Sequence, residues 1–324
     1  MQTETFSYND EQFADLQMLR YRVDGFDRLS IARKKLIYYL SEAALAGRDI
    51  LWDQNGKYNL RIRKTLETLY TDNPGDRNSS DLRALAVYLK RVWFANGIHH
   101  HYGCEKFKPE FSEAFFREAV RNVPADKLPL EEGQTAEELC DLLVPVIFDP
   151  EVMSKRVNQA DGDDLVRTSA CNYYGDGVTQ TEAETFYNAM KQEGDPHPVM
   201  YGMNSRLVKA DGNLQEKVWK SGGLYGAAID RIIYWLEKAT GVAETGRGAP
   251  QTHRILPHRR PEDIRRIHHP VGTGDRGDGG LHQRFHGNLR RPVGTESQLG
   301  RIRQLQGLGS HGAYGKAERQ RPMV

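Results

Sequence analysis

The order of apolar and polar residues is most regular between Pro198 and Ala239. Residues 205–219 form two short extended runs joined at Asp211-Gly212, a dipeptide suited to the positive φ angles of a tight hairpin turn. Gly222-Gly223 ends the second run, and a helical period begins at Leu224. One stripe of that helix is apolar and comprises Tyr225, Ile229, Ile232, Ile233 and Leu236. The pattern therefore predicts a β-hairpin followed by an amphipathic helix.

Upstream of this stretch the period is mostly helical. Apolar stripes and caps predict helices over residues 10–22, 30–45, 58–70, 81–96, 110–120, 135–144 and 179–191. In the first of these, Phe13, Leu16 and Leu19 are expected to face inward. Residues 49–57 are expected to form a turn at 53–56. The predicted fold class is α+β, mostly helical with a small antiparallel β element.

Two of these helices carry a capping box, in which a threonine is followed three residues later by a glutamate. The pairs are Thr135 with Glu138 and Thr179 with Glu182. In such a box each side chain accepts a hydrogen bond from the backbone of the other residue. A serine before the helix at 81–96 and Gly97 after it mark its two ends.

This regularity stops near Glu244. The last 80 residues contain 14 Arg, 14 Gly and seven His but one Lys, and carry a net charge of +9 against −8 for residues 1–244. No window in 245–324 sustains an apolar stripe, so we expect no packed core there. The sequence thus divides into a folded unit, 1–244, and a tail, 245–324, that is expected to be disordered or out of frame.

Three interpretations of the tail stay open. It resembles a disordered Arg/Gly arm for RNA, although regular RGG spacing and stacking aromatic residues are missing. It is also compatible with a solvated linker. Arginine with almost no lysine, abundant glycine and no periodicity are equally typical of an out-of-frame translation. Shifting the frame of residues 251–272 by one nucleotide permits a well-formed amphipathic sequence, which favours this third interpretation.

Several classes of protein are disfavoured by the composition. The first residues lack the basic and apolar regions of a signal peptide, and no apolar run approaches the roughly 20 residues of a membrane span. A cytoplasmic location is the default expectation. The three cysteines, Cys104, Cys140 and Cys171, are far apart and indicate buried or free thiols rather than a disulfide framework.

Two local patterns suggest metal binding, and neither is strong. Consecutive side chains in His99-His100-His101 diverge in a helix or a strand, so the three histidines cannot easily share one ion, and hydrogen-bonded local structure is the alternative. The run 161–164 lacks the spacing of a calcium loop and is expected to be a solvated turn. Spacing alone discloses no catalytic site. Nucleophile-elbow, P-loop and HExxH motifs are absent from the sequence, and the glycine-rich run that begins at Gly272-Thr-Gly274 lies in the tail, without the strand-turn-helix context of a dinucleotide site.

Five strings, taken in order, resemble the amino-terminal half of bacterial dipeptidyl peptidase III. They are residues 92–103 (VWFANGIHHHYG), 132–135 (EGQT), 156–162 (RVNQADG), 169–174 (SACNYY) and 202–208 (GMNSRLV). The resemblance covers essentially residues 5 to 244. The segment that follows in the family is close to what the shifted frame of 251–272 permits, so a frameshift near Glu244 is favoured.

The resemblance implies a zinc exopeptidase that removes dipeptides from the free amino end of short peptides, in a two-lobed fold whose amino-terminal part includes a small β-barrel. The family's zinc is held by a helix carrying His-Glu-x-x-Gly-His and a further glutamate. No His-Glu pair occurs in this sequence. We therefore expect no zinc to bind to this chain and no peptidase activity from it.

Five residues are the candidates for peptide binding by position in the resemblance. The strand at 201–208 could pair with an extended peptide, and amide and hydroxyl groups could bind the peptide's amino end; the candidates are Asn172, Tyr173, Tyr174, Tyr201 and Asn204. Edge-strand and core roles are the alternative for each. Residues 174–177 hold one residue more than the family's usual loop. The other candidate function is a helical binding module with a basic nucleic-acid arm, although nucleic acid is the less favoured partner and no membrane partner is expected.

Overall fold

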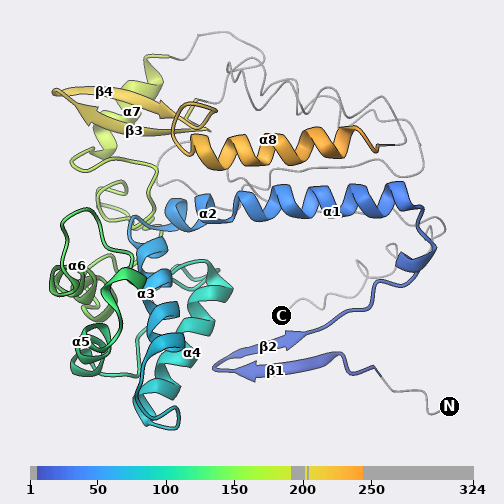
Figure 1. Ribbon diagram of the computed structural model, residues 1–324. Coiled ribbons are helices and arrows are strands. Elements are labelled where there is room, and N and C mark those ends of the chain that lie inside the picture. The colour runs from blue at the N-terminus through green and yellow to red at the C-terminus, as the bar shows by residue number, and fades with distance from the viewer. Residues whose placement is uncertain (1–5, 191–200, 203, 244–324) are drawn as a thin grey trace, which may run out of the picture.

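The computed structural model of the protein describes residues 6–190, 201–202 and 204–243. Eight α-helices and two β-hairpins form two packed groups along this part of the chain (Figure 1). The helices are α1 (Ile31–Ala46), α2 (Arg48–Asn55), α3 (Asn59–Asp72), α4 (Ser80–Ala95), α5 (Glu113–Asn122), α6 (Ala136–Phe148), α7 (Gln180–Asn188) and α8 (Gly226–Thr240). The strands are β1 (Asn9–Phe13), β2 (Leu16–Leu19), β3 (Ser205–Ala210) and β4 (Asn213–Val218). The predicted α+β class, mostly helical with small antiparallel sheets, is confirmed.

The helix predicted at 10–22 is wrong, because β1 and β2 form an antiparallel hairpin there. Leu16 and Met18 share the half-buried face, whereas Leu19 is exposed rather than inward. Contacts with α4 hold the hairpin: Glu11 pairs with Lys90, and Asp15 lies 3.2 Å from Arg91. These tertiary contacts outweigh the local helical pattern, which is a weak preference in a stretch this short.

The turn predicted at 53–56 is also wrong, because most of this segment is helical. Helix α2 continues to Asn55, and only Gly56 leaves the helix. Burial explains the difference, since Ile50 and Trp52 are 4% and 2% exposed and anchor α2 between the two packed groups.

The other predicted helices are present, and α4, α6 and α7 begin at the predicted caps. Ser79 accepts a hydrogen bond from the Leu82 amide at the start of α4, and Asn96 ends that helix in the left-handed conformation. Both capping boxes form, with Thr135 and Glu138 starting α6 and Thr179 and Glu182 starting α7. Helix α6 runs to Phe148, past Pro145, so its carboxyl end lies beyond the predicted one.

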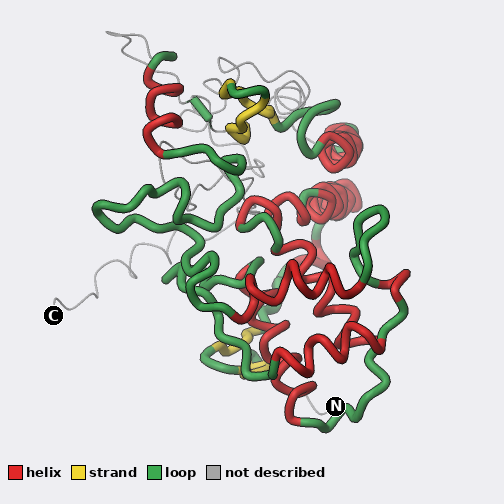
Figure 2. The backbone as a smooth tube through the Cα atoms, turned by 90° about the vertical axis from the view of Figure 1, so that its left-hand side faces the viewer, coloured by secondary structure: helices red, strands yellow, loops and turns green. Residues whose placement is uncertain are grey.

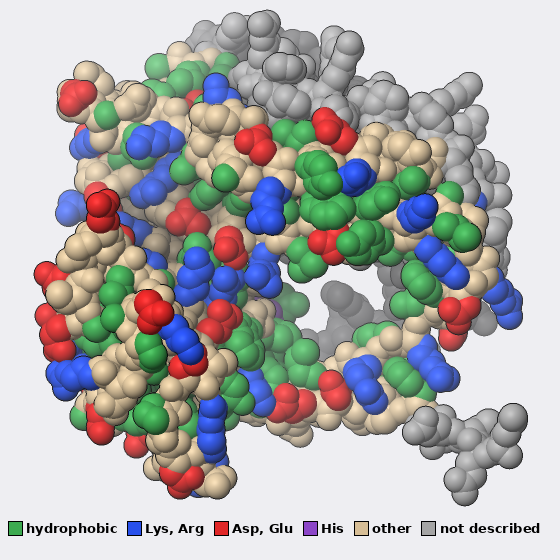
Figure 3. Space-filling model, viewed as in Figure 1, with side chains coloured by type: hydrophobic (Ala, Val, Ile, Leu, Met, Phe, Trp, Pro, Cys, Tyr) green, Lys and Arg blue, Asp and Glu red, His purple; other side chains and the backbone are tan. Residues whose placement is uncertain are grey.

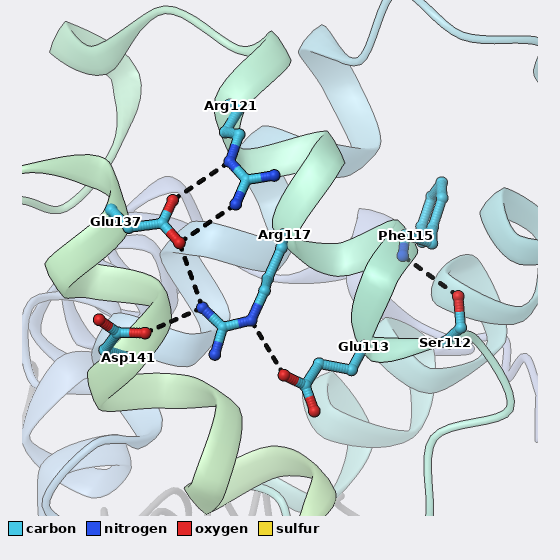
Figure 4. Close-up of polar contacts among 7 residues, drawn as sticks. All are labelled: Ser112, Glu113, Phe115, Arg117, Arg121, Glu137 and Asp141. Carbon is cyan, nitrogen blue, oxygen red and sulfur yellow. Dashed lines mark hydrogen bonds and ion pairs between the residues drawn. The ribbon is translucent and has the colours of Figure 1, made fainter.

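One apolar core lies among α3, α4, α5 and α6. Its fully buried side chains include Leu66, Leu85, Phe116 and Leu143. On the surface, α5 and α6 are joined by Arg117, which donates to Glu113, Glu137 and Asp141, while Arg121 makes two further bonds to Glu137 (Figure 4). The charges of the two helices are therefore complementary where they meet.

A second core lies under α1, α8, α7 and the β3–β4 hairpin. Helices α1 and α8 pack along their lengths and appear end-on, one above the other, in Figure 2. Buried apolar residues of this core include Val178, Leu207, Ile229, Ile232 and Leu236. The β3–β4 hairpin turns at Asp211 and Gly212, which have φ angles of 50° and 77°, as predicted for this dipeptide.

The tail at 245–324, with its predicted disorder, shifted frame or nucleic-acid role, lies outside the described residues. Across the part of the chain that the structure describes, no helix is both long enough and apolar enough to cross a bilayer.

Candidate functional site

The carboxylate of Asp53, near the end of α2, is the centre of a polar cluster. Its Oδ2 atom accepts hydrogen bonds from Asn172 Nδ2, at 3.1 Å, and from the Tyr225 hydroxyl, at 2.5 Å. Asn172 is 5% exposed, and its backbone N–H donates to the Gln54 backbone carbonyl at 3.0 Å. Three segments far apart in the sequence are thus joined at one carboxylate oxygen.

Tyr225 reaches Asp53 because of an unusual backbone conformation at the start of α8. Its φ of 62° places it in the left-handed region, which is rarely adopted by a bulky residue. Burial raises the pKa of its hydroxyl far above the usual range, and the nearby Asp53 carboxylate adds to this effect, while the Arg206 guanidinium opposes it. Tyr225 therefore stays a neutral hydrogen-bond donor to Asp53 at ordinary pH.

The segment after Asn172 pairs with strand β3. The Tyr173 carbonyl accepts from the Leu207 amide at 3.0 Å, and the Gly175 amide donates to the Leu207 carbonyl at 2.7 Å. These two bonds make a parallel bridge between Tyr174 and Leu207. At Leu207, the backbone edge of β3 that does not pair with β4 is therefore already hydrogen-bonded to the segment 173–175.

The loop at 174–177 closes against neighbouring elements. Asp176 forms an ion pair with Lys57 at 2.8 Å, and this hydrogen bond raises the pKa of Lys57. Lys209 donates to the Gly177 carbonyl at 2.8 Å. A Cβ atom at Gly175 would lie 3.1 Å from the Val208 Cα atom, so the loop approaches β3 more closely than a side chain allows.

The five residues predicted for peptide binding fall into two groups. Asn172, Tyr173 and Tyr174 are buried, at 5%, 1% and 7% exposure. Tyr201 and Asn204 are half-buried just before β3, where the Asn204 carbonyl accepts from the Trp219 amide. The structure brings Asn172 into the Asp53 cluster, pairs Tyr173 and Tyr174 with β3 through the backbone, and leaves the second group at the beginning of the hairpin.

Sequence patterns did not identify Asp53 and Tyr225 as site residues, although Asp53 is the centre of the cluster and Tyr225 donates to it. Two buried polar groups near them were also missed: the Gln54 side-chain amide and the Trp219 indole N–H, which have no hydrogen-bond partner within the described residues. The Trp219 ring lies 6.1 Å from that of Tyr173 and 5.9 Å from that of Tyr225. No local spacing could have linked Asp53 to Tyr225, which is 172 positions away.

The three consecutive histidines take different partners. His99 is 2% exposed, its Nε2 donates to the Met153 carbonyl at 2.7 Å, and burial lowers its pKa to about 4. His100 Nδ1 instead accepts from the Gly103 amide at 3.0 Å. Within the residues described here, no three His, Cys, Asp or Glu side chains are placed to hold a metal ion.

Comparisons with known proteins give a limited result. No protein-family model matches the chain, and no curated protein matches it. Among solved structures, the chain is similar to the structure of DPP III from Caldithrix abyssi, with 17% sequence identity and a TM-score of 0.41 over 71% of this chain. The match spans 31% of the length of that protein, and at this TM-score the likeness is partial.

Proposed function

We propose that the described part of this chain is a peptide-binding lobe of a dipeptidyl peptidase III-like protein, and that its Asp53 cluster receives the free amino end of a short peptide. The observation that supports this most directly is the contact of Asn172 with Asp53. Asn172 and Tyr174 belong to one string of the family resemblance, and Leu207 belongs to another. The two strings meet through the bridge between Tyr174 and Leu207.

The chemistry of Asp53 suits an ammonium ligand. The hydrogen bonds from Asn172 and Tyr225 both use its Oδ2 atom, and its side chain is half-buried. The Oδ1 atom is the acceptor we assign to the peptide's α-ammonium group, because a charge-assisted bond to a partly desolvated carboxylate is stronger than one in water. The peptide's backbone would then extend toward Tyr201 and Asn204, the predicted residues at the beginning of β3.

No catalytic step is assigned to the described residues. The sequence contains no His-Glu pair, and His99 and His100 bond to the Met153 carbonyl and the Gly103 amide. We infer that this lobe binds and orients peptides and that zinc chemistry, where it occurs, requires residues other than these.

The test compares two peptides that differ only in the amino group. Tetra-alanine with a free amino end and its N-acetylated form would be titrated into the full chain by calorimetry. We expect the free peptide to bind about 10–100 times more tightly, which corresponds to one hydrogen bond to a charged group.

Variants of the cluster provide the controls. Asp53→Asn should remove the preference for the free amino end and leave the weak binding of the acetylated peptide unchanged. Glu11→Gln, on the β1–β2 hairpin away from the cluster, is the matched carboxylate control and should behave as the wild type. Equal affinity of the wild-type chain for the two peptides would contradict the proposal.

A further inference from the structure

Helix α1 is apolar around most of its circumference, which is unusual for a helix at the surface. Between Ile31 and Ala46, its polar side chains are those of Arg33, Lys34, Lys35, Ser41 and Glu42. One side of the helix packs on α8, where Ala43 is 5% exposed and the Tyr39 and Trp235 rings stack with centroids 6.0 Å apart. A helix that is apolar all round is normally covered on more than one side.

A second apolar stripe on α1 is exposed. Ile31, Tyr38 and Leu45 are 74%, 53% and 51% exposed and lie seven residues apart, which places them on one face because two turns of helix take about 7.2 residues. The Trp235 ring of α8 contacts Tyr38 on one side and Tyr234 on the other. Tyr234, which is 51% exposed, therefore extends the exposed apolar surface from α1 onto α8. Figure 3 shows the hydrophobic side chains gathered along α1 and α8 on this face, with basic side chains among them.

The charges that flank this stripe are self-complementary. Lys35 lies three residues before Tyr38 and Glu42 four residues after it, on the same edge of the stripe by helical geometry. They are too far apart along one helix to pair with each other. In an antiparallel pair of α1 helices with a two-fold axis at Tyr38, Glu42 of one copy lies beside Lys35 of the other, and Ile31 lies beside Leu45.

We propose that the exposed face of α1 binds the same face of a second copy of this chain, as an antiparallel, two-fold symmetric helix pair centred on Tyr38. Such an interface is isologous, so each favourable contact occurs twice. A second copy is the occupant that accounts for both features of the face, the order of apolar residues and the opposite charges on one edge. This inference is independent of the proposed peptide site.

The size of the contact predicts a weak dimer. A 16-residue helix is about 24 Å long, so one helix pair with the flanking Tyr234 buries less than the roughly 800 Å² per partner of a standard interface. We therefore expect monomer and dimer to exchange, with dissociation in the micromolar range.

The two-fold axis gives a sharp crosslinking test on the full chain. Cys104 is half-buried while Cys140 and Cys171 are buried, so a Cys104→Ser background leaves few competing thiols. Tyr38→Cys should link to itself with a short bismaleimide, because it lies on the axis. Ile31→Cys alone and Leu45→Cys alone should link poorly, whereas a mixture of these two variants should give a covalent dimer.

Charge reversal tests the register without introducing thiols. Sedimentation velocity over a range of concentrations should show dimer formation by the wild type. Glu42→Lys and Lys35→Glu should each weaken dimerisation about tenfold, since each places two like-charged pairs in contact, and the double variant should restore it to within about threefold. A wild-type chain that stays monomeric at every concentration, a double variant no better than the single ones, or Ile31→Cys linking to itself as readily as Tyr38→Cys would overturn the proposal.

Discussion

Replacing Tyr225 with phenylalanine tests whether the Asp53 cluster stabilises the fold. The substitution removes the hydroxyl that donates to Asp53 Oδ2 at 2.5 Å and keeps the ring in contact with Trp219. Because the shape is preserved, no cavity adds to the effect. A hydrogen bond to a charged group contributes about 1.5–3 kcal/mol, so the free energy of unfolding should fall by about 2 kcal/mol. This is a large share of the roughly 5–15 kcal/mol that stabilises a typical native protein.

Urea unfolding followed by tryptophan fluorescence measures this loss, as the shift in the midpoint multiplied by the slope of the transition. Tyr234→Phe is the matched control on the same helix, because that residue is 51% exposed and should change stability by less than about 0.5 kcal/mol. In a double-mutant cycle with Asp53→Asn, the two substitutions should couple by about 1 kcal/mol or more. Equal midpoints for Tyr225→Phe and Tyr234→Phe would refute this reasoning.

Three further predictions follow from individual contacts, and a fourth from the absence of a His-Glu pair in the sequence. Burial lowers the pKa of His99 to about 4, whereas a histidine in the unfolded chain has a pKa near 6.5. Between these two pH values the unfolded chain binds one proton more at His99 than the folded chain does. The free energy of unfolding should therefore fall as pH drops from about 6.5 to about 4, by up to ~1.4 kcal/mol per pH unit. When urea midpoints are measured across this range, His99→Gln should show a much weaker dependence on pH. Gly175→Ala should cost about 1–3 kcal/mol in the same assay, because its Cβ would lie 3.1 Å from Val208 Cα, whereas Gly241→Ala, with no such atom nearer than 3.6 Å, should cost less. Arg117→Ala should lower stability by about 1 kcal/mol at low salt and by less at high salt, as thermal melts at two ionic strengths would record. The full chain incubated with zinc should release no naphthylamine from a dipeptidyl naphthylamide, and chelator-sensitive release would contradict this expectation.

Features set by a few neighbouring residues could be predicted from the sequence. Both capping boxes and the Asp211-Gly212 turn depend on side chains within three positions of each other, and all three form. The β1–β2 hairpin could not be predicted in this way, because its strands are four and five residues long and are held by Lys90 and Arg91, some 80 positions away. A short amphipathic stretch fits a helix or a hairpin until a partner surface selects one of them.

Only part of the candidate site could be predicted from the sequence, because the rest depends on contacts between residues far apart along the chain. Asn172, Tyr173 and Tyr174 occur in one string and were identified through resemblance. Asp53 lies in a segment expected to be a turn, and Tyr225 in a helical stripe expected to be core. Only the folded chain joins them, since the carboxylate, the amide and the hydroxyl come from α2, the loop before α7 and the start of α8.

The position of Asp53 connects the site with the stability of both packed groups. Helix α2 places Trp52 in the core of α3–α6 and Ile50 in the core beneath α1 and α8, and Asp53 follows Trp52 directly. The carboxylate therefore lies where the two cores meet, while its donors Asn172 and Tyr225 come from the second core's side of this junction. A change in how the two cores pack against α2 moves the acceptor relative to its donors. For this reason, substitutions at Ile50 or Trp52 should alter peptide binding through Asp53 even though neither side chain belongs to the polar cluster.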